Sequence, residues 1–74
     1  MNGDFNIGDR LHELRTAQGQ SQEQLALRSG ITTTYLGLIE RNLKNPTIKV
    51  MEQLCCSLNI SLSDFFNVAH KPSH

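Results

Sequence analysis

The chain has 74 residues and carries no net charge, with seven basic and seven acidic side chains. This length corresponds to one small domain, whose limited core makes self-association a common route to stability. No apolar run is long enough to cross a bilayer and no cleavable leader is evident, so we expect a cytoplasmic protein without a membrane or small-molecule partner.

The charged side chains are unevenly distributed along the chain. Residues 24–50 carry Arg28, Arg41, Lys44 and Lys49 against Glu40, whereas residues 1–23 and 51–74 each have a negative balance. Contact with phosphates depends on the local field rather than on the total charge. The middle of the chain is therefore the part best suited to nucleic acid.

The first two predicted helices cover residues 7–18 and a segment that opens at Ser21. Apolar residues recur at helical spacing in the first, from Ile7 through Leu11 and Leu14, and Ala17 extends the same face. Gly19 suits the position just after its end. Ser21 and Gln24 form a capping box, and Gly30 is free to adopt the left-handed turn that ends the second helix.

Three further helices are expected. The third spans residues 32–41 with Thr32 as its N-cap, and the fourth follows Thr47. The fourth has an apolar stripe made of Ile48, Met51, Leu54, Cys55 and Leu58, and Asn59 ends it. Ser61 opens a short last helix. No segment alternates like a strand, which predicts a compact all-α, five-helix domain over residues 7–67, an N-terminal arm at 1–6 and a flexible tail at 68–74.

Enzymatic chemistry is not expected. Cys55 and Cys56 are adjacent, so they neither bridge easily nor form a spaced zinc-binding set. No nucleophile with a base, phosphate-cradling loop or metal set is present, which predicts a protein without cofactor or metal that is not an enzyme. Ordinary packing of Cys55 is favoured over a redox role for Cys56.

Residues 22–41 have the properties of a helix-turn-helix. The steep crossing of two short helices needs a small residue, which is Ala26, and a turn residue that tolerates positive φ, which is Gly30. The apolar residues that would hold both helices to the domain are Leu25, Ile31, Leu36 and Ile39. Ser29 is a weaker match, because an apolar residue is commoner there, but its small size suits the packing.

The chain resembles the XRE group of lambda-repressor-like and Cro-like DNA-binding domains. The resemblance covers residues 7–66 and rests on 21–26 (SQEQLA), 30–31 (GI), 35–36 (YL), 39–42 (IERN) and 45–47 (NPT). Residues 39–48 (IERNLKNPTI) are also similar to the controller proteins of restriction–modification systems. The resemblance implies a lambda-repressor-like fold and a transcriptional regulator that binds double-stranded DNA.

The resemblance also implies roles for individual residues. The outer face of the third helix would touch base edges through Thr33, Thr34, Gly37 and Leu38. Contacts to the DNA backbone, or mixed contacts, would come from Gln22, Tyr35, Lys44 and Asn45. Arg15 and Glu40 would form a pair that fixes the recognition helix to the first helix. Gly37 and Leu38 stand where many relatives have polar residues that contact bases, so the resemblance does not predict the operator sequence.

Leu62, Phe65 and Phe66 give the last helix more large apolar side chains than a small core must absorb. One or two of them could complete the core of a single chain. We expect part of the group, together with the outer face of the fourth helix, to form the two-fold interface of a homodimer, which suits a roughly palindromic operator with half-sites one helical turn apart. One alternative is an antitoxin or another protein-interaction module of the same fold. The short segment after Asn67 argues against it, because a module of that kind needs an extension that wraps its partner.

Overall fold

The computed structural model describes residues 5–67, which form five helices and no strand. The helices are α1 (Ile7–Ala17), α2 (Gln22–Ser29), α3 (Thr33–Glu40), α4 (Ile48–Leu58) and α5 (Leu62–Phe65). The predicted all-α, five-helix architecture is confirmed. Residues 1–4 of the predicted arm and all of the predicted tail, 68–74, lie outside the described residues.

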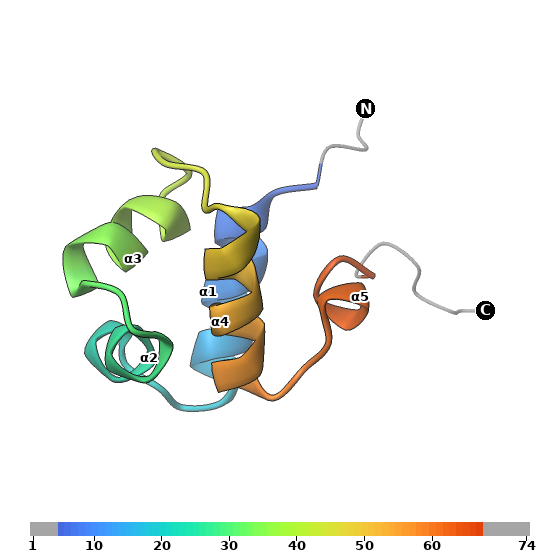
Figure 1. Ribbon diagram of the computed structural model, residues 1–74, viewed down its shortest axis with the longest axis horizontal. Helices are drawn as coiled ribbons and strands as arrows, with labels where there is room; N and C mark the ends of the chain where they lie inside the picture. The colour runs from blue at the N-terminus through green and yellow to red at the C-terminus, as the bar shows by residue number, and fades with distance from the viewer. Residues whose placement is uncertain (1–4, 68–74) are drawn as a thin grey trace.

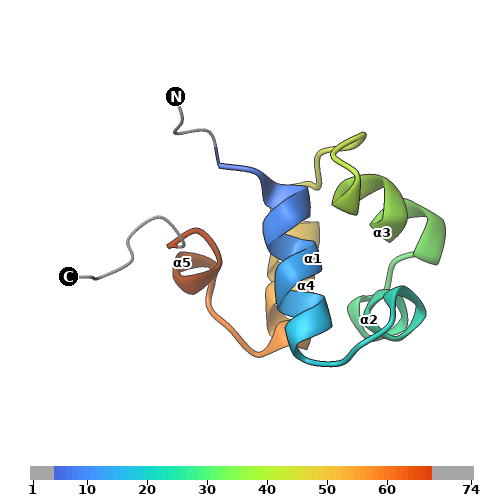
Figure 2. The same cartoon turned by 180° about the vertical axis from the view of Figure 1, so that it is seen from behind.

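The helices are arranged along the long axis of the molecule. α2 and α3 lie at one end, α5 lies at the other, and α1 and α4 stand between them (Figure 1). The view from behind shows the same order with α1 toward the viewer (Figure 2). The pair α2–α3 is therefore separated from α5 by the two longest helices, which have 11 residues each.

Each helix begins with a side-chain cap, which explains why the boundaries follow the sequence so closely. Ser21, Thr32, Thr47 and Ser61 accept hydrogen bonds from the backbone amide three residues later, and the Ser21–Gln24 capping box is complete. Such caps satisfy amides that have no partner inside the helix. The predicted left-handed residues that follow helices are also present, with φ of 73° at Gly30 and 60° at Asn59.

The end of α3 has a structure that the sequence pattern did not predict. Asn42 adopts a left-handed φ of 62°, the Asn42 amide donates to the carbonyl of Ile39, and the Leu43 amide donates to the carbonyl of Leu38. This is the double hydrogen bond of a Schellman ending. The Asn42 side chain also accepts from the backbone amide of Gly8, 3.0 Å away, and so links the end of α3 to the start of α1.

The core is made of side chains from all five helices. Its buried apolar members are Leu11, Leu25, Ala26, Leu36, Ile39, Met51, Leu54, Cys55, Leu58 and Phe65. Two predictions for the helix faces are wrong. Ile48 is 75% exposed, because it is the first residue of α4 and no neighbouring element covers it. Ala17 is exposed at the last turn of α1, where the chain leaves the core.

Phe65 also needs a correction. It was expected at a dimer surface, but its side chain is fully buried within one chain, with 0% exposure. Its ring belongs to the same buried cluster as the apolar side chains of the other four helices. A second copy of the chain therefore has no access to Phe65, and only Leu62 and Phe66 of the predicted group reach the surface.

The start of α1 packs directly on the end of α3. A Cβ atom at Gly8 would clash with the carbonyl oxygen of Ile39 and come within 2.7 Å of the carbonyl oxygen of Glu40. Real Cβ atoms do not approach backbone oxygens this closely. Glycine at position 8 is therefore what allows the two helices to meet.

Gly8→Ala is expected to destabilise the domain by roughly 1–3 kcal/mol, since the new methyl group must push the two helices apart. Thermal unfolding followed by circular dichroism should show a lower melting temperature. Thr16→Ala, an exposed change on the same helix, serves as the matched control and should leave it nearly unchanged. Equal melting temperatures for Gly8→Ala and the wild type would show that the α1–α3 contact can relax without cost.

Candidate nucleic-acid interface

α2 and α3 form the two arms of a helix-turn-helix. The first arm turns into the second through Gly30, and the Ile31 amide donates to the carbonyl of Ala26 over 3.0 Å. Leu25 and Leu36, one from each helix, are completely buried in the core. Ser29, the weakest match in the sequence, is buried and donates from its hydroxyl to that of Ser57, 2.9 Å away, so its polar group has a partner on α4.

The residues predicted to touch bases occupy one face of α3 but differ in exposure. Thr33 and Thr34 are exposed, and Leu38 is half-buried. Gly37 is buried, because the guanidinium of Arg41 and the amide of Gln22 lie over it. A base can therefore reach the backbone of Gly37 only if these two side chains move aside.

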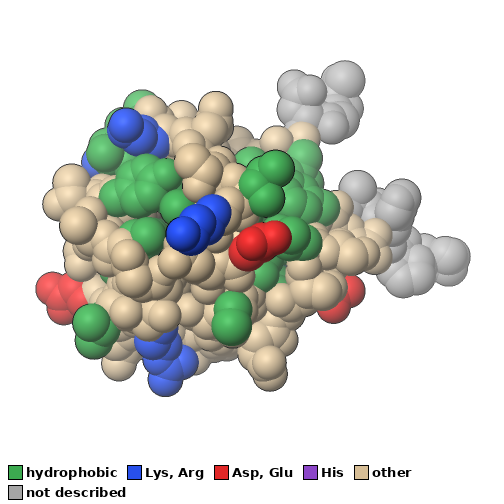
Figure 3. Space-filling model, in the orientation of Figure 1, with side chains coloured by type: hydrophobic (Ala, Val, Ile, Leu, Met, Phe, Trp, Pro, Cys, Tyr) green, Lys and Arg blue, Asp and Glu red, His purple; other side chains and the backbone are tan. Residues whose placement is uncertain are grey.

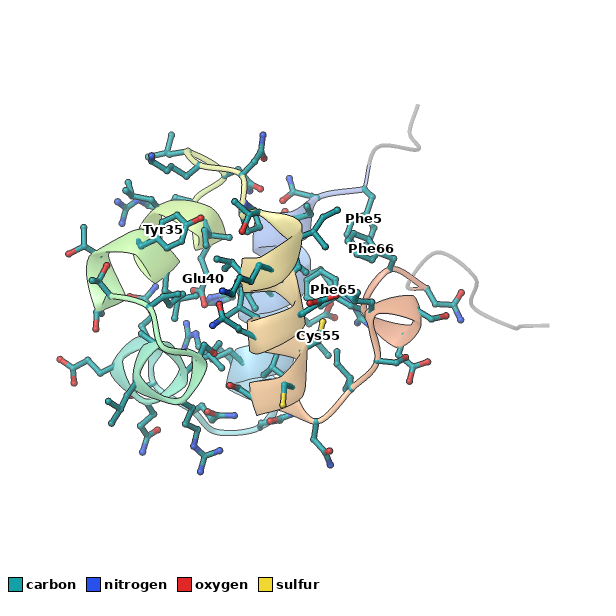
Figure 4. All side chains as sticks on the ribbon, viewed as in Figure 1. Phe5, Tyr35, Glu40, Cys55, Phe65 and Phe66 are labelled. Carbon is teal, nitrogen blue, oxygen red and sulfur yellow. The ribbon has the colours of Figure 1, made fainter. Side chains whose placement is uncertain are left out.

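The residues predicted to touch the DNA backbone surround this face. Lys44 and Asn45 are exposed in the loop between α3 and α4. Tyr35 is half-buried and packs against the edge of the core (Figure 4). Gln22 begins α2, but its side-chain amide donates to Glu40 over 3.0 Å, so in this structure Gln22 also joins α2 to α3.

Arg15 and Glu40 form the predicted pair. The Arg15 Nε donates to Glu40 Oε2 at 2.6 Å and the Arg15 Nη2 donates to Glu40 Oε1 at 3.0 Å, a two-pronged contact between α1 and the end of α3. Arg15 Nη1 donates in addition to the backbone carbonyl of Gln20. Both side chains are almost completely buried, with 10% and 4% exposure. The pair fixes the orientation of α3 relative to α1.

Glu40 is the centre of a larger cluster that includes a residue the sequence did not indicate. His12 Nδ1 lies 3.2 Å from Glu40 Oε1 and 3.1 Å from Arg15 Nη2. Burial of the carboxylate works to raise its pKa. The hydrogen bonds from Arg15, Gln22 and His12, together with the charge of Arg15, outweigh burial and lower the pKa of Glu40 below its usual value of 4.5.

Arg10 is a second residue that the sequence did not indicate. Its guanidinium donates to the backbone carbonyls of Phe65 and Asp64, at 2.8 and 2.9 Å, and so satisfies the end of α5 from α1. It also lies 6.0 Å from the centre of the Phe65 ring. More than 50 residues separate Arg10 from these carbonyls, so no local pattern could reveal the contact.

An aromatic cluster lies beside α5, at the end of the molecule away from α2 and α3 (Figure 4). The Phe5 and Phe66 rings are 5.1 Å apart, and both are partly exposed, at 36% and 45%. The Phe65 ring lies 5.1 Å from that of Phe66, in an edge-to-face arrangement. In the space-filling view, hydrophobic side chains gather on this part of the visible face (Figure 3).

Other kinds of site find no support within residues 5–67. This part of the chain holds no group of three or more side chains able to bind a metal ion, and none of its helices is long and apolar enough to cross a membrane. Cys55 is buried, which raises the pKa of its thiol, and Cys56 is exposed. Neither thiol takes part in the interface described above.

Comparison with known proteins identifies the domain. Residues 11–65 match the family model HTH_3, described as Helix-turn-helix. The chain belongs to this helix-turn-helix family. The match agrees with the resemblance to the XRE group and includes all of α2 and α3.

The relatives of this helix-turn-helix chain are regulators and controller proteins. It is 38% identical over 65 residues to the HTH-type transcriptional regulator PuuR of Escherichia coli, covering 88% of this chain and 35% of PuuR. It is 33% identical over 69 residues to the HTH-type transcriptional regulator SinR of Bacillus subtilis, covering 92% of this chain and 62% of SinR. The chain thus spans between about a third and three-fifths of these two regulators.

The chain covers a larger share of two proteins of known structure. The restriction-modification controller protein C.AhdI from Aeromonas hydrophila superimposes with a TM-score of 0.80 at 41% identity, over 82% of this chain and 92% of C.AhdI. SinR has been solved in complex with DNA, and that structure superimposes with a TM-score of 0.75 at 37% identity, over 80% of this chain and 95% of the SinR chain.

Glu40→Ala is expected to lower the free energy of unfolding by roughly 3–5 kcal/mol, because it leaves the buried Arg15 guanidinium without its counter-charge. DNA binding should weaken as well, since α3 is no longer tied to α1. Chemical denaturation measures the first effect. Glu13→Ala removes an exposed glutamate of α1, 3.8 Å from Arg10, and should cost less than about 1 kcal/mol. An unchanged stability of Glu40→Ala would contradict the role assigned to the pair.

The same cluster predicts a dependence of stability on pH. Because folding lowers the pKa of Glu40, its contribution is complete above the usual value of 4.5 and is lost as pH falls through the lower folded value. Glu40→Gln cannot ionise, so the gap in melting temperature between it and the wild type should be largest near neutral pH and should shrink below pH 4.5. A difference in melting temperature of the same size at pH 7 and pH 3 would contradict a stabilising role for the charge of Glu40.

Proposed function

We propose that this chain is a sequence-specific DNA-binding transcriptional regulator that places α3 in the major groove of an operator. The observation that carries the proposal is the rigid attachment of α3: the Arg15–Glu40 contact, 2.6 Å at its shortest, holds the helix while Thr33 and Thr34 remain exposed. A recognition helix needs both properties, a fixed position and a surface that is open to base edges. The regulators PuuR and SinR among its relatives support this function.

The proposed contacts divide into two kinds. Thr33, Thr34 and Leu38 face the bases, where threonine hydroxyls form hydrogen bonds and apolar groups pack on thymine methyls, and Gly37 contributes to the same face. Gln22, Tyr35, Lys44 and Asn45 surround that face and contact the DNA backbone, which positions the protein without reading sequence.

We also propose that the chain acts as a homodimer in the cytoplasm, with Leu62 and Phe66 at the two-fold interface. Leu62 begins α5 and Phe66 follows its last residue. α5 lies at the end of the molecule away from α2 and α3, so a partner there leaves both recognition helices accessible (Figure 1). Two copies related by a two-fold axis suit paired half-sites on DNA. The proposal involves no catalysis, cofactor or small ligand.

The more specific form of the proposal is control of a restriction–modification operon. It rests on C.AhdI, a controller protein that the chain matches over 92% of that protein's length. In this form of the proposal, control of transcription depends on the concentration of the protein and on cooperative binding to the operator.

Selection from a random pool of DNA fragments tests sequence-specific binding. We expect a two-fold-symmetric sequence to be enriched. Fluorescence anisotropy with that sequence should show an affinity that falls steeply as salt rises. The slope of log association constant against log salt concentration should be roughly −0.9 for each phosphate that the protein neutralises. Weak, salt-sensitive binding to every fragment without enrichment would contradict operator recognition and direct attention to a protein partner.

Sedimentation equilibrium tests the dimer. The wild type should be dimeric at tens of micromolar, and Phe66→Asp should weaken the dimer at least about tenfold, since it places a charge in an apolar contact. Leu27→Asp changes another exposed apolar side chain, on α2, and should leave the dimer intact. A wild type that stays monomeric both with and without DNA would overturn this part of the proposal.

A further inference from the structure

The space beside Gly37 is filled by a charged side chain from the next helical turn. At the position where a Cβ atom of residue 37 would lie, the nearest neighbours are Arg41 Nη1 at 3.7 Å and Gln22 Oε1 at 3.8 Å. Arg41 follows Gly37 by four residues, and helical side chains lean toward the N-terminus and cover the preceding turn. The absence of a side chain at Gly37 lets the Arg41 guanidinium lie along the outer surface of α3.

Within the described part of the chain, the charge of Arg41 has no counter-charge. Arg41 is exposed, and no carboxylate lies within ion-pairing distance of it in residues 5–67. The neighbouring carboxylate, Glu40, is buried and is occupied by Arg15 and Gln22. Of these two adjacent residues, one is therefore held inside the domain and the other is exposed to solvent.

Helical geometry places Arg41 on the face of α3 that is proposed to meet the bases. At 100° per residue, its direction falls between those of Thr33 and Leu38 and close to that of Thr34. The other side chains of this face, two threonines and a leucine, offer at most one hydroxyl each. Only the guanidinium presents two parallel N–H donors, the arrangement that matches O6 and N7 of guanine in the major groove.

We propose that Arg41 reads a guanine in each half-site, and that Gly37 provides the space in which its guanidinium lies against α3. This inference rests on the proposed function, DNA recognition by α3. It assigns a specificity-determining role to Arg41, which marks the end of the recognition helix, and a positioning role to Gly37.

Binding of the wild type and variants to the selected operator, and to operators with each base pair changed in turn, tests the proposal. Wild type should lose roughly tenfold to hundredfold in affinity when one G·C pair of each half-site is changed. Arg41→Ala should bind the original operator more weakly by a similar factor and should no longer discriminate at that pair. Arg41→Lys keeps the charge but loses the paired donors, so it should keep the salt dependence and lose the discrimination.

Further variants test whether the position of the Arg41 guanidinium matters, and not only the presence of a positive charge. Gly37→Met fills the space under the guanidinium and should reduce discrimination at the same base pair, whereas Gly37→Ala adds a methyl group at ordinary contact distance and should retain it. Arg28→Ala removes an exposed arginine of α2 and should leave discrimination at every position unchanged. Circular dichroism confirms that each variant is folded.

The outcomes distinguish this inference from the function on which it rests. Enrichment of an operator together with unchanged discrimination by Arg41→Ala would overturn the reading role alone. An equal loss of affinity on all operators would also overturn it, since that is the behaviour of a phosphate contact. Failure of the wild type to enrich any sequence would overturn the proposed function and this inference with it.

Discussion

One carboxylate holds the helix-turn-helix half of this molecule together. Glu40 ends α3 and accepts hydrogen bonds from Arg15 of α1 and Gln22 of α2, so that three helices meet at its two oxygens. A carboxylate this deeply buried would be costly alone, and the pairing with Arg15 compensates for the loss of water. What the arrangement gives is a fixed direction for α3, since an apolar contact could slide where a two-pronged ion pair cannot.

A second contact, between the start of α1 and the end of α3, allows these two helices to approach closely. Gly8 lets the start of α1 touch the last carbonyls of α3, and Asn42 receives the Gly8 amide just after that helix ends. The pair at Glu40 and the hydrogen bond at Asn42 therefore fix α3 at two points near its C-terminus. Its N-terminal turn, which carries Thr33 and Thr34, extends away from these attachments and stays exposed.

The sequence predicted what is encoded locally and missed what depends on distant neighbours. Caps such as Ser21 and Thr47 marked helix starts to within a residue, because a cap acts on amides only three positions away. The Arg15–Glu40 pair was found through resemblance to a family, not through spacing. Arg10 and Phe65 were missed or misplaced, since their roles follow from how α5 folds back on α1, and a four-residue helix gives too short a pattern to show which face is buried.

The same pair also changes which charges the helix-turn-helix exposes, although the chain as a whole carries no net charge. Of the charged residues in and just after α3, the single negative one, Glu40, is buried and neutralised by Arg15. The basic residues that follow Glu40 in the chain, Arg41, Lys44 and Lys49, are exposed. Folding thus buries the carboxylate of Glu40 together with its counter-charge, so the ion pair that orients α3 also keeps a negative charge away from the exposed surface where a phosphate would be met.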